Sequence, residues 1–295
     1  MPMNQFAVRR LGRTEIRATE IGLGCARMGM ADRTDENAIR GIRVAIDHGV
    51  NYLDTSTGYG ESERRIGLAL QGGWREKVYL QTKMGTNPAR HGDYTAEGTR
   101  WSVENSLRLL QTDHLDAVLI HDPTDVGVPL APGFALDELL KMKEKGLIGH
   151  VGIGCYEPEA HRRAIETGRI DIVLTFLRYT LLDQSAAQTT LPLARRYDVG
   201  VQLASVFGCW SGALAGLEPK DNPRAQSMWS WCRDRGLNLR RLALHFALAA
   251  PIDGIVIVGP GTPEHVEDVC CEALDPVPAE IWRDFKAEFG VGVEP

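Results

Sequence analysis

The stretch Asn51-Tyr-Leu-Asp-Thr-Ser-Thr-Gly-Tyr-Gly-Glu-Ser-Glu63 places an acid, a phenol and two glycines at the end of an expected strand. Residues 51–56 predict a short strand, the glycines allow a turn, and Ser62 can begin a helix. We therefore expect Asp54 and Tyr59 on or beside a strand-to-helix loop, where α/β enzymes keep their chemistry. Taken alone, such a pair is more often structural, with the acid capping a turn and the phenol acting as an anchor.

Two further expected strands also end in ionisable side chains. Residues 78–83 end in Lys83, and residues 115–122 end in His121 and Asp122. In a parallel barrel the carboxyl ends of the strands converge on one face, so these side chains are expected to meet. A solvated lysine and a core histidine are the ordinary interpretations of either residue alone, but three such strand ends together favour a catalytic group.

The whole chain alternates strand and helix patterns, which predicts an α/β fold, a (β/α)8 TIM barrel formed by residues 1–295 as a single domain. Such a barrel needs about 250 residues. An N-terminal β-hairpin within 6–21 would close the bottom of the barrel, and extra C-terminal helices are expected around Trp229, around Leu242 and over 278–290. The long segment 206–251 is typical of a lid or pocket wall. The expected strands are 19–24, 51–56, 78–83, 115–122, 147–154, 170–176, 200–205 and 254–259, and the expected helices between them include 36–48, 62–70, 95–110 and 135–145.

Composition excludes several classes of partner. The chain is 43% hydrophobic and 24% charged, with a net charge of −6 and a pI near 5.8, which disfavours a nucleic-acid or anionic-membrane partner. No 18 apolar residues run together, so a cytoplasmic protein is expected. The six cysteines lack metal-ligand spacing, which predicts reduced thiols and no metal site. A monomer or small homo-oligomer that binds a small molecule is the expectation.

Asp54, Tyr59, Lys83 and His121, with the phrases Asp-Thr-Ser-x-x-Tyr-Gly-x-Ser-Glu and Leu-Ile-His-Asp around them, resemble the aldo-keto reductase superfamily over nearly the whole chain. The resemblance implies an oxidoreductase that transfers hydride between a nicotinamide and a carbonyl or alcohol carbon. Tyr59 would give or take the proton, and Lys83, kept charged by Asp54, would lower the pKa of the phenol. His121 would hydrogen-bond the substrate oxygen.

No Gly-x-Gly-x-x-Gly motif stands between a strand and a helix, so a two-domain dinucleotide fold is not expected. The resemblance instead implies NAD or NADP lying across the barrel mouth. Gly154-Cys155 stands where the superfamily commonly has Ser-Asn, and Thr175 or a neighbour where it has Gln, while Phe207 is suited to stack on the nicotinamide. The implied cofactor-binding residues are Gly24, Arg27, Met28, Asp54, Gly154, Cys155, Thr175, Phe207, Ser211, Gly212, Leu214, Gly259, Gly261, Thr262, His265, Glu267 and Asp268.

The choice between the two dinucleotides depends on charge near the adenosine. Residues 259–269 lack the Lys or Arg that would pair with a 2′-phosphate, so NAD is the preferred expectation. A cation from another loop, such as Arg27 or Arg224, or a protonated His265, would restore NADP binding.

The phrase Arg-Tyr-Thr-Leu-Leu-Asp-Gln at 178–184, followed by Leu-Pro-Leu at 191–193 and a Ser-Gly turn at 211–212, resembles a subgroup of this superfamily. Its members are aldose 1-dehydrogenases that oxidise L-fucose, D-threo-aldoses or L-galactose to lactones, which implies a sugar hemiacetal as substrate. One alternative is an NADPH-dependent carbonyl reductase of small aldehydes or pyridoxal-like compounds. Another is a cofactor-binding regulatory subunit, which the intact Tyr59 and Lys83 disfavour.

Overall fold

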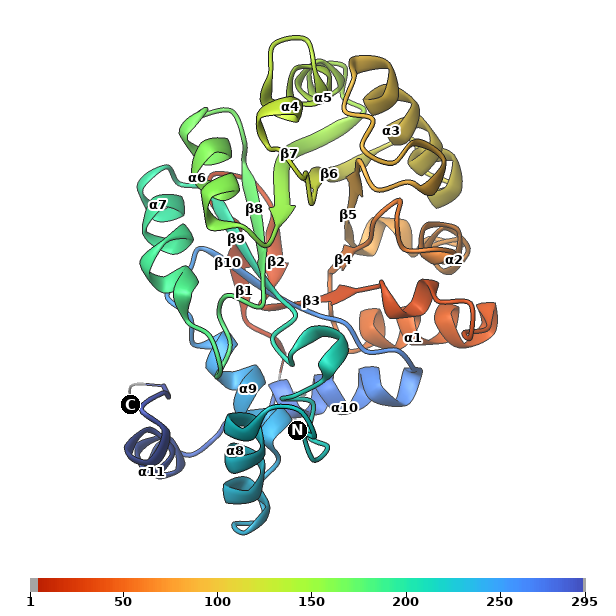
Figure 1. Ribbon diagram of the computed structural model, residues 1–295. Helices are drawn as coiled ribbons and strands as arrows, with labels where there is room; N and C mark the ends of the chain where they lie inside the picture. The colour runs from red at the N-terminus through yellow and green to blue at the C-terminus, as the bar shows by residue number, and fades with distance from the viewer. Residues whose placement is uncertain (1–4, 294–295) are drawn as a thin grey trace.

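The computed structural model describes residues 5–293, so the outermost residues of the expected domain, 1–4 and 294–295, lie outside the described part. Within it, parallel strands close into a barrel in chain order, with the last strand paired to the first (Figure 1). The (β/α)8 prediction is confirmed, and each strand overlaps its expected stretch. The strands are β3 (Ile21–Gly24), β4 (Tyr52–Asp54), β5 (Tyr79–Met84), β6 (Leu115–His121), β7 (Ile148–Cys155), β8 (Ile172–Phe176), β9 (Gly200–Ala204) and β10 (Gly254–Val258).

Helices surround the strands because each buries one apolar face against the outside of the barrel. Some of these helices begin at a side-chain cap: Thr95, for example, accepts a hydrogen bond from the Gly98 amide at the start of α3. No helix within residues 5–293 combines the length and apolar character that crossing a bilayer requires. The helices of the ring are α1 (Asp35–Asp47), α2 (Ser62–Ala69), α3 (Ala96–Leu110), α5 (Ala135–Glu144), α6 (Pro158–Glu166), α7 (Thr190–Arg196), α9 (Leu239–Leu248) and α10 (Pro263–Ala273).

Shorter and additional helices lie outside this ring. The single turn α4 (Gly127–Leu130) lies in the connection between β6 and α5. Helices α8 (Pro223–Arg233) and α11 (Ala279–Phe289) share with α9 a hydrophobic cluster of their own and form a group at the lower edge of Figure 1. The predicted extra C-terminal helices are therefore confirmed. Single 3-10 turns are η1 (Arg27–Gly29), η2 (Arg75–Lys77), η3 (Pro88–Arg90), η4 (Ser185–Gln188) and η5 (Cys209–Ser211).

The N-terminal hairpin closes one end of the barrel, as predicted. Strands β1 (Val8–Arg10) and β2 (Arg17–Thr19) pair antiparallel, and Leu11 and Ile16 beside them pack into the cluster that fills the barrel interior. The turn fits closely against β9: a Cβ on Gly12, whose φ is +53°, would lie 2.0 Å from the Gly200 nitrogen. The opposite end, where the strands finish, is thus the end that stays open.

The barrel interior changes from apolar to polar along the strands. Near the hairpin it holds side chains such as Ile172 and Ile255, whereas toward the strand ends it holds the buried Asp54, Gln81 and Lys83. Buried polar groups are costly unless they are hydrogen-bonded to one another. The open end of the barrel is therefore where the sequence has placed groups that must find partners.

Glu63 fastens α2, and with it the loop that carries Tyr59, to the strand that carries Lys83. Its side chain is buried, and the Thr82 hydroxyl on β5 donates to Glu63 Oε1 at 2.6 Å. Burial raises the pKa of Glu63, although the hydrogen bond from Thr82 offsets part of the rise. Because the folded state favours the protonated acid, stability is greatest below the ordinary pKa of glutamate and falls as pH rises through the raised value.

Glu63→Gln keeps the shape of the side chain and removes its charge. We expect it to raise the melting temperature at pH 8 by roughly 3–6 °C, since 1 kcal/mol in the free energy of unfolding corresponds to about 2–4 °C in a chain of this size. At pH 5 the gain should be smaller, because wild-type Glu63 is then more fully protonated. Thermal melts at both pH values measure this, with the exposed Glu61→Gln as control. Equal gains at the two pH values would contradict the assignment.

Candidate active site

Lys83 and Asp54 form a buried ion pair at the open end of the barrel. Lys83 Nζ donates to Asp54 Oδ1 at 2.6 Å, to Asp54 Oδ2 at 2.7 Å and to the Thr55 carbonyl at 2.8 Å, and the two side chains are only 1% and 6% exposed. Burial lowers the pKa of Lys83, but Asp54 and Tyr59 raise it, and the balance holds the pKa above its usual value. The site therefore contains a permanent ammonium that water hardly reaches.

Tyr59 lies over this ammonium, with Lys83 Nζ 4.9 Å from the centre of its ring. The loop after β4 reaches this place because Gly29 lets η1 approach: a Cβ there would lie against the Tyr59 carbonyl. Burial raises the pKa of Tyr59, and Lys83 lowers it by less. The expected influence of the lysine is present, but the net pKa is raised, so Tyr59 is a phenol that holds its proton.

His121, the last residue of β6, faces Tyr59, with ring centres 5.6 Å apart and ring planes nearly perpendicular. Burial and the charge of Lys83 lower the pKa of His121 well below its ordinary value, so the imidazole is neutral. Its Nδ1 lies 2.8 Å from Ser56 Oγ and 2.9 Å from Thr86 Oγ1. These two hydroxyls engage one ring nitrogen and leave Nε2 as the nitrogen available to a ligand.

The structure thus brings together all four residues predicted as catalytic, Asp54, Tyr59, Lys83 and His121, with the strand-end Asp122 beside them, and adds Ser56, a neighbour that sequence reasoning missed. Ser56 belongs to the quoted motif itself, and its place two residues after Asp54 could have suggested it. Asp122, which directly follows His121, has a φ of +39°, and its Oδ2 lies 3.6 Å from His121 Nε2. Within residues 5–293, no group of three or more His, Cys, Asp or Glu side chains could hold a metal ion.

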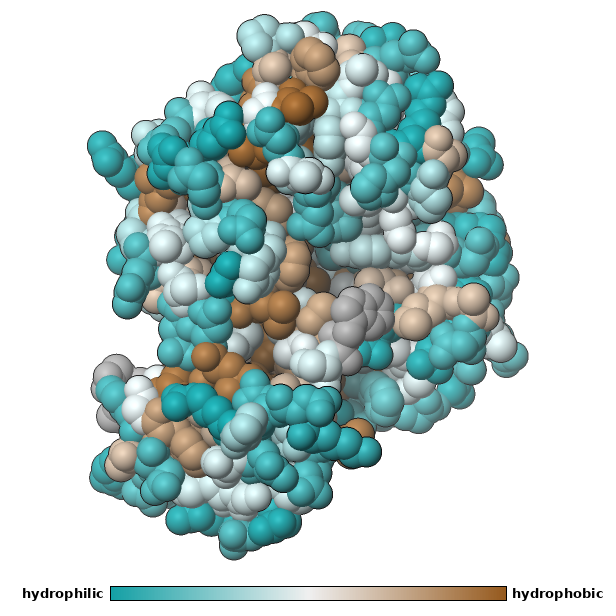
Figure 2. Space-filling view, in the orientation of Figure 1, coloured by the Kyte–Doolittle hydropathy of each residue, from teal (hydrophilic) through white to brown (hydrophobic). Residues whose placement is uncertain are grey.

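A groove of about 840 Å³ runs from Tyr59 to the start of α10, beneath the segment that follows β9. Figure 2 shows this face of the molecule hollowed between the ring of helices and the group formed by α8 and α11. Many of the residues expected to bind the cofactor line this groove. They are Gly24, Arg27, Asp54, Phe207, Ser211, Gly212, Gly259, Gly261 and His265.

Other expected cofactor residues lie elsewhere. Met28 and Leu214 are buried in the hydrophobic clusters, Gly154 and Cys155 end β7, Thr262 caps α10, and Glu267 and Asp268 are exposed on α10. Burial raises the pKa of the Cys155 thiol to about 12, so it is a neutral group.

Thr175, near the end of β8, carries a free hydrogen-bonding group. Its Oγ1 is buried and has no hydrogen-bond partner among the described residues. A nicotinamide carboxamide has both the donor and the acceptor that such a hydroxyl lacks. Thr175 does not line the groove, so the fit to a nicotinamide dinucleotide rests on the groove and on Phe207 and Arg33 in its wall.

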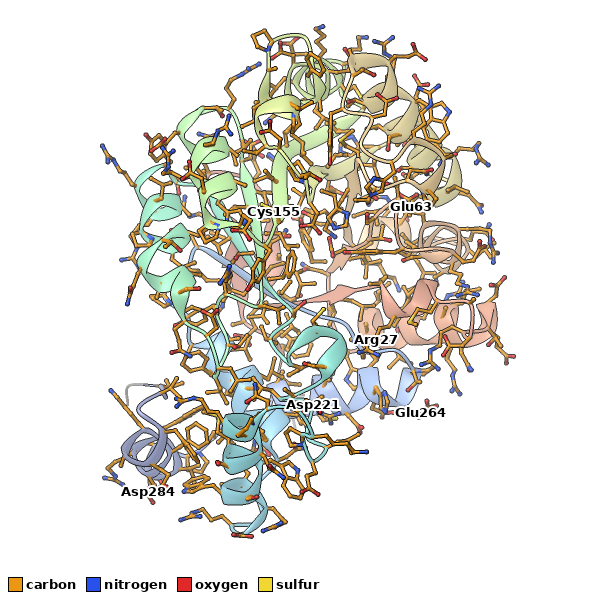
Figure 3. All side chains as sticks on the ribbon, in the orientation of Figure 1. Arg27, Glu63, Cys155, Asp221, Glu264 and Asp284 are labelled. Carbon is orange, nitrogen blue, oxygen red and sulfur yellow. The ribbon has the colours of Figure 1, made fainter. Side chains whose placement is uncertain are left out.

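The end of the groove near α10 is richer in cations than residues 259–269 alone suggested. Arg33 and Arg27 come from the loop after β3, and Arg33 Nη2 lies 3.6 Å from the point where a Cβ on Gly261 would stand. Arg224, in contrast, donates to the Phe289 carbonyl and does not line the groove. In Figure 3, Arg27 and Glu264 lie on the same side of the barrel, and Asp221 stands at the start of α8. Separate loops, distant in sequence, supply this charge.

A parallel barrel with a phenol, an ammonium and a neutral imidazole at its open end, beside a groove of about 840 Å³, defines an NAD(P)-dependent oxidoreductase that acts on alcohol or carbonyl carbon. The sequence model described as "Aldo/keto reductase family" matches residues 20–284. The chain therefore belongs to the aldo-keto reductase family, as the resemblance implied.

Relatives of known activity agree with this assignment. The chain is 30% identical to a D-threo-aldose 1-dehydrogenase from Pseudomonas sp, over 90% of this chain and 92% of that protein. It is 26% identical to the L-galactose dehydrogenase of Arabidopsis thaliana, over 90% and 88%. Among solved structures, an aldo-keto reductase from Bacillus halodurans has a TM-score of 0.77 at 21% identity and covers 98% of both chains. A Klebsiella pneumoniae aldo/keto reductase in complex with NADP and acetate has a TM-score of 0.76 at 23% identity and covers 98% of this chain and 96% of that one.

Proposed function

We propose that this protein is an aldose 1-dehydrogenase, which oxidises the hemiacetal carbon of a sugar to a lactone with Tyr59 as the proton-transfer residue. The two sugar dehydrogenases among the relatives support this proposal. The observation that carries it is the Asp122 carboxylate beside His121 Nε2, because a carboxylate accepts hydrogen bonds from the many hydroxyl donors of a sugar.

A nicotinamide dinucleotide held in the groove would supply the hydride acceptor for C1 of the sugar, or the hydride donor in the reverse direction. His121 Nε2 hydrogen-bonds the C1 oxygen and holds it toward the Tyr59 hydroxyl. In oxidation Tyr59 first loses its proton to solvent, Lys83 stabilises the resulting phenolate, and the C1 hydroxyl proton then passes to Tyr59. In reduction Tyr59 donates its proton to the carbonyl oxygen, which its raised pKa suits.

We expect Tyr59→Phe to lower kcat by roughly 10²–10⁴-fold, because it removes only the group that transfers the proton. The dissociation constant of the dinucleotide should stay close to that of wild type, as measured by fluorescence quenching. Tyr79→Phe is the matched control, because Tyr79 begins β5, away from the end of that strand where Lys83 lies. A folded Tyr59→Phe protein that turns over at the wild-type rate would refute the proposed role.

Asp122 contacts the substrate in this proposal and does not support the fold. Its side chain is 43% exposed, in contrast to the 6% of Asp54, and its left-handed backbone turns it away from the strand that carries His121. Burial raises the pKa of Asp122 and Lys83 lowers it by less. A carboxylate there favours a polyhydroxylated ligand and offers nothing to an apolar ketone.

We expect Asp122→Asn to raise the KM for an aldose substrate by roughly tenfold, in line with one lost charge-assisted hydrogen bond. The KM for a small aldehyde without further hydroxyls, assayed in reduction, should be unchanged. Asp125→Asn, a more exposed acid of the same loop, is the control. An equal rise for both substrates would favour the alternative, a carbonyl reductase of small aldehydes or pyridoxal-like compounds. The pyridoxal 4-dehydrogenase from Microbacterium luteolum, which is 27% identical to this chain, is a relative that acts on pyridoxal.

For the cofactor, we propose that NADP binds at least as tightly as NAD. The preference for NAD was based on the lack of cations within residues 259–269, but Arg33 approaches Gly261 from another loop. Its Nε is buried without a hydrogen-bond partner among the described residues, and its Nη2 is 3.6 Å from Asp32 Oδ2. A guanidinium held in this way pairs well with a phosphate. The Klebsiella pneumoniae enzyme solved with NADP supports the same choice.

We expect Arg33→Ala to weaken NADP binding by roughly tenfold and to leave NAD binding unchanged, because only NADP carries the 2′-phosphate. Separate titrations of each dinucleotide by fluorescence quenching measure this. Arg17→Ala, on the hairpin at the far end of the barrel, is the control. Wild-type protein that binds NAD ten times more tightly than NADP would restore the preference for NAD.

A further inference from the structure

A closed polar cluster fills the barrel directly beneath the Lys83–Asp54 pair. Gln81 Nε2 lies 2.7 Å from Asp54 Oδ1 and 2.8 Å from Gln202 Oε1. Gln202 Nε2 lies 2.8 Å from the Tyr52 hydroxyl and 2.9 Å from Gln81 Oε1, and that hydroxyl lies 2.8 Å from Gln81 Oε1. Gln81, Gln202 and Tyr52 are all completely buried.

The orientation of every group in this cluster follows from Asp54. An ionised carboxylate only accepts hydrogen bonds, so Gln81 must turn its NH2 toward Asp54 and its carbonyl away. The carbonyl of Gln81 then accepts from both the Tyr52 hydroxyl and the Gln202 amide, and the Tyr52 oxygen accepts the second Gln202 proton. All four amide protons and the phenolic proton have an acceptor, so no member can reverse without leaving a buried group unpaired.

The cluster also spans the barrel. Asp54 and Gln81 are register partners on the adjacent strands β4 and β5, whereas Gln202 comes from β9, on the opposite side of the closed sheet. Apolar side chains usually fill this part of a parallel barrel, and they would pack it without any need for matched donors. A complete polar cluster at this depth fixes the carboxylate more tightly than apolar packing could.

We propose that Gln81 is a positioning residue of the active site: its amide holds the Asp54 carboxylate, and through it the Lys83 ammonium, in the geometry that proton transfer at Tyr59 requires. Gln202 and Tyr52 act one step further away, by fixing the direction of the Gln81 amide. This inference rests on the proposed role of Tyr59 in proton transfer.

Charge balance around Tyr59 gives the expected direction of change. The groups that face Tyr59 are Lys83 on β5, Asp54 on β4, and His121 and Asp122 at the end of β6. Lys83 lowers the pKa of Tyr59, and Asp54 and Asp122 raise it. Gln81 donates to Asp54 Oδ1 and so compensates part of the negative charge of Asp54. Without that donor the field at Tyr59 becomes more negative, and the phenol gives up its proton at higher pH.

The test is the pH profile of sugar oxidation by Gln81→Met, which keeps the approximate size of the side chain and removes the donor. We expect kcat to fall roughly tenfold and its acidic limb to move up by about one pH unit. The KM for the sugar and the dissociation constant of the dinucleotide should stay within about twofold of wild type, because Gln81 does not line the groove.

Gln202→Met is the matched comparison, because it breaks three contacts of the same cluster but none to Asp54. It should also lower the melting temperature, with a smaller movement of the pH profile. Equal movement in the two variants, or none in either, would overturn the proposal and leave the cluster a purely structural one.

Gln81→Glu keeps the shape of the side chain and serves where the methionine variant does not fold. Its carboxyl can donate to Asp54 at low pH but repels Asp54 once ionised, so the loss of kcat should grow as pH rises. Wild-type behaviour of this variant at all pH values would also overturn the proposal. Tyr59→Phe separates the two hypotheses: activity in that variant removes the role of Tyr59, whereas an inactive Tyr59→Phe beside an unaffected Gln81→Met removes only the role of Gln81.

Discussion

The interior of the barrel depends on one buried charge, the ammonium of Lys83. An unpaired ammonium in such surroundings would cost several kcal/mol, so the fold must bring a carboxylate and a carbonyl to it. Asp54 and Thr55, on the neighbouring strand and its loop, provide them. Burial and this charge together keep His121 neutral, and the charge opposes part of the effect of burial on Tyr59. Burial and one desolvated cation thus act together on the protonation of the groups around it.

Much of this site could be predicted from sequence, because it is built from neighbouring strands. Parallel pairing sets Asp54 beside Gln81, and the two-residue period of a strand turns Lys83 to the same side as Gln81. His121 ends the next strand along. Residues at the ends of consecutive strands meet in any closed parallel barrel, whatever its helices and loops do. The strand pattern was therefore enough for Asp54, Lys83 and His121, whereas Tyr59 lies on the loop after β4.

The features that sequence reasoning missed depend on contacts between residues that lie far apart in the sequence. Gln202 meets Gln81 from the opposite wall of the barrel, and Arg33 approaches Gly261 from a loop more than two hundred positions earlier. The net direction of the Tyr59 pKa depends on how deeply the ring is buried, which no local pattern reports. A polar residue inside the otherwise apolar strand Gly200–Ala204 was the one signal available, since a buried amide needs a partner.

The fold separates the groups that transfer the proton from those that choose the ligand. Lys83, Asp54 and the Gln81 cluster lie on strands, almost without solvent access, where packing on every side holds them in place. Asp122 and Arg33 lie on the loops that follow strands, partly exposed, at opposite ends of the region that a dinucleotide and its substrate would occupy. A change at Arg33 would alter binding without disturbing the charges that act on Tyr59, whereas Asp122 also raises the pKa of Tyr59 and so belongs in part to both sets. The same barrel can therefore acquire a new substrate or a new dinucleotide preference through its loops while its proton chemistry stays fixed.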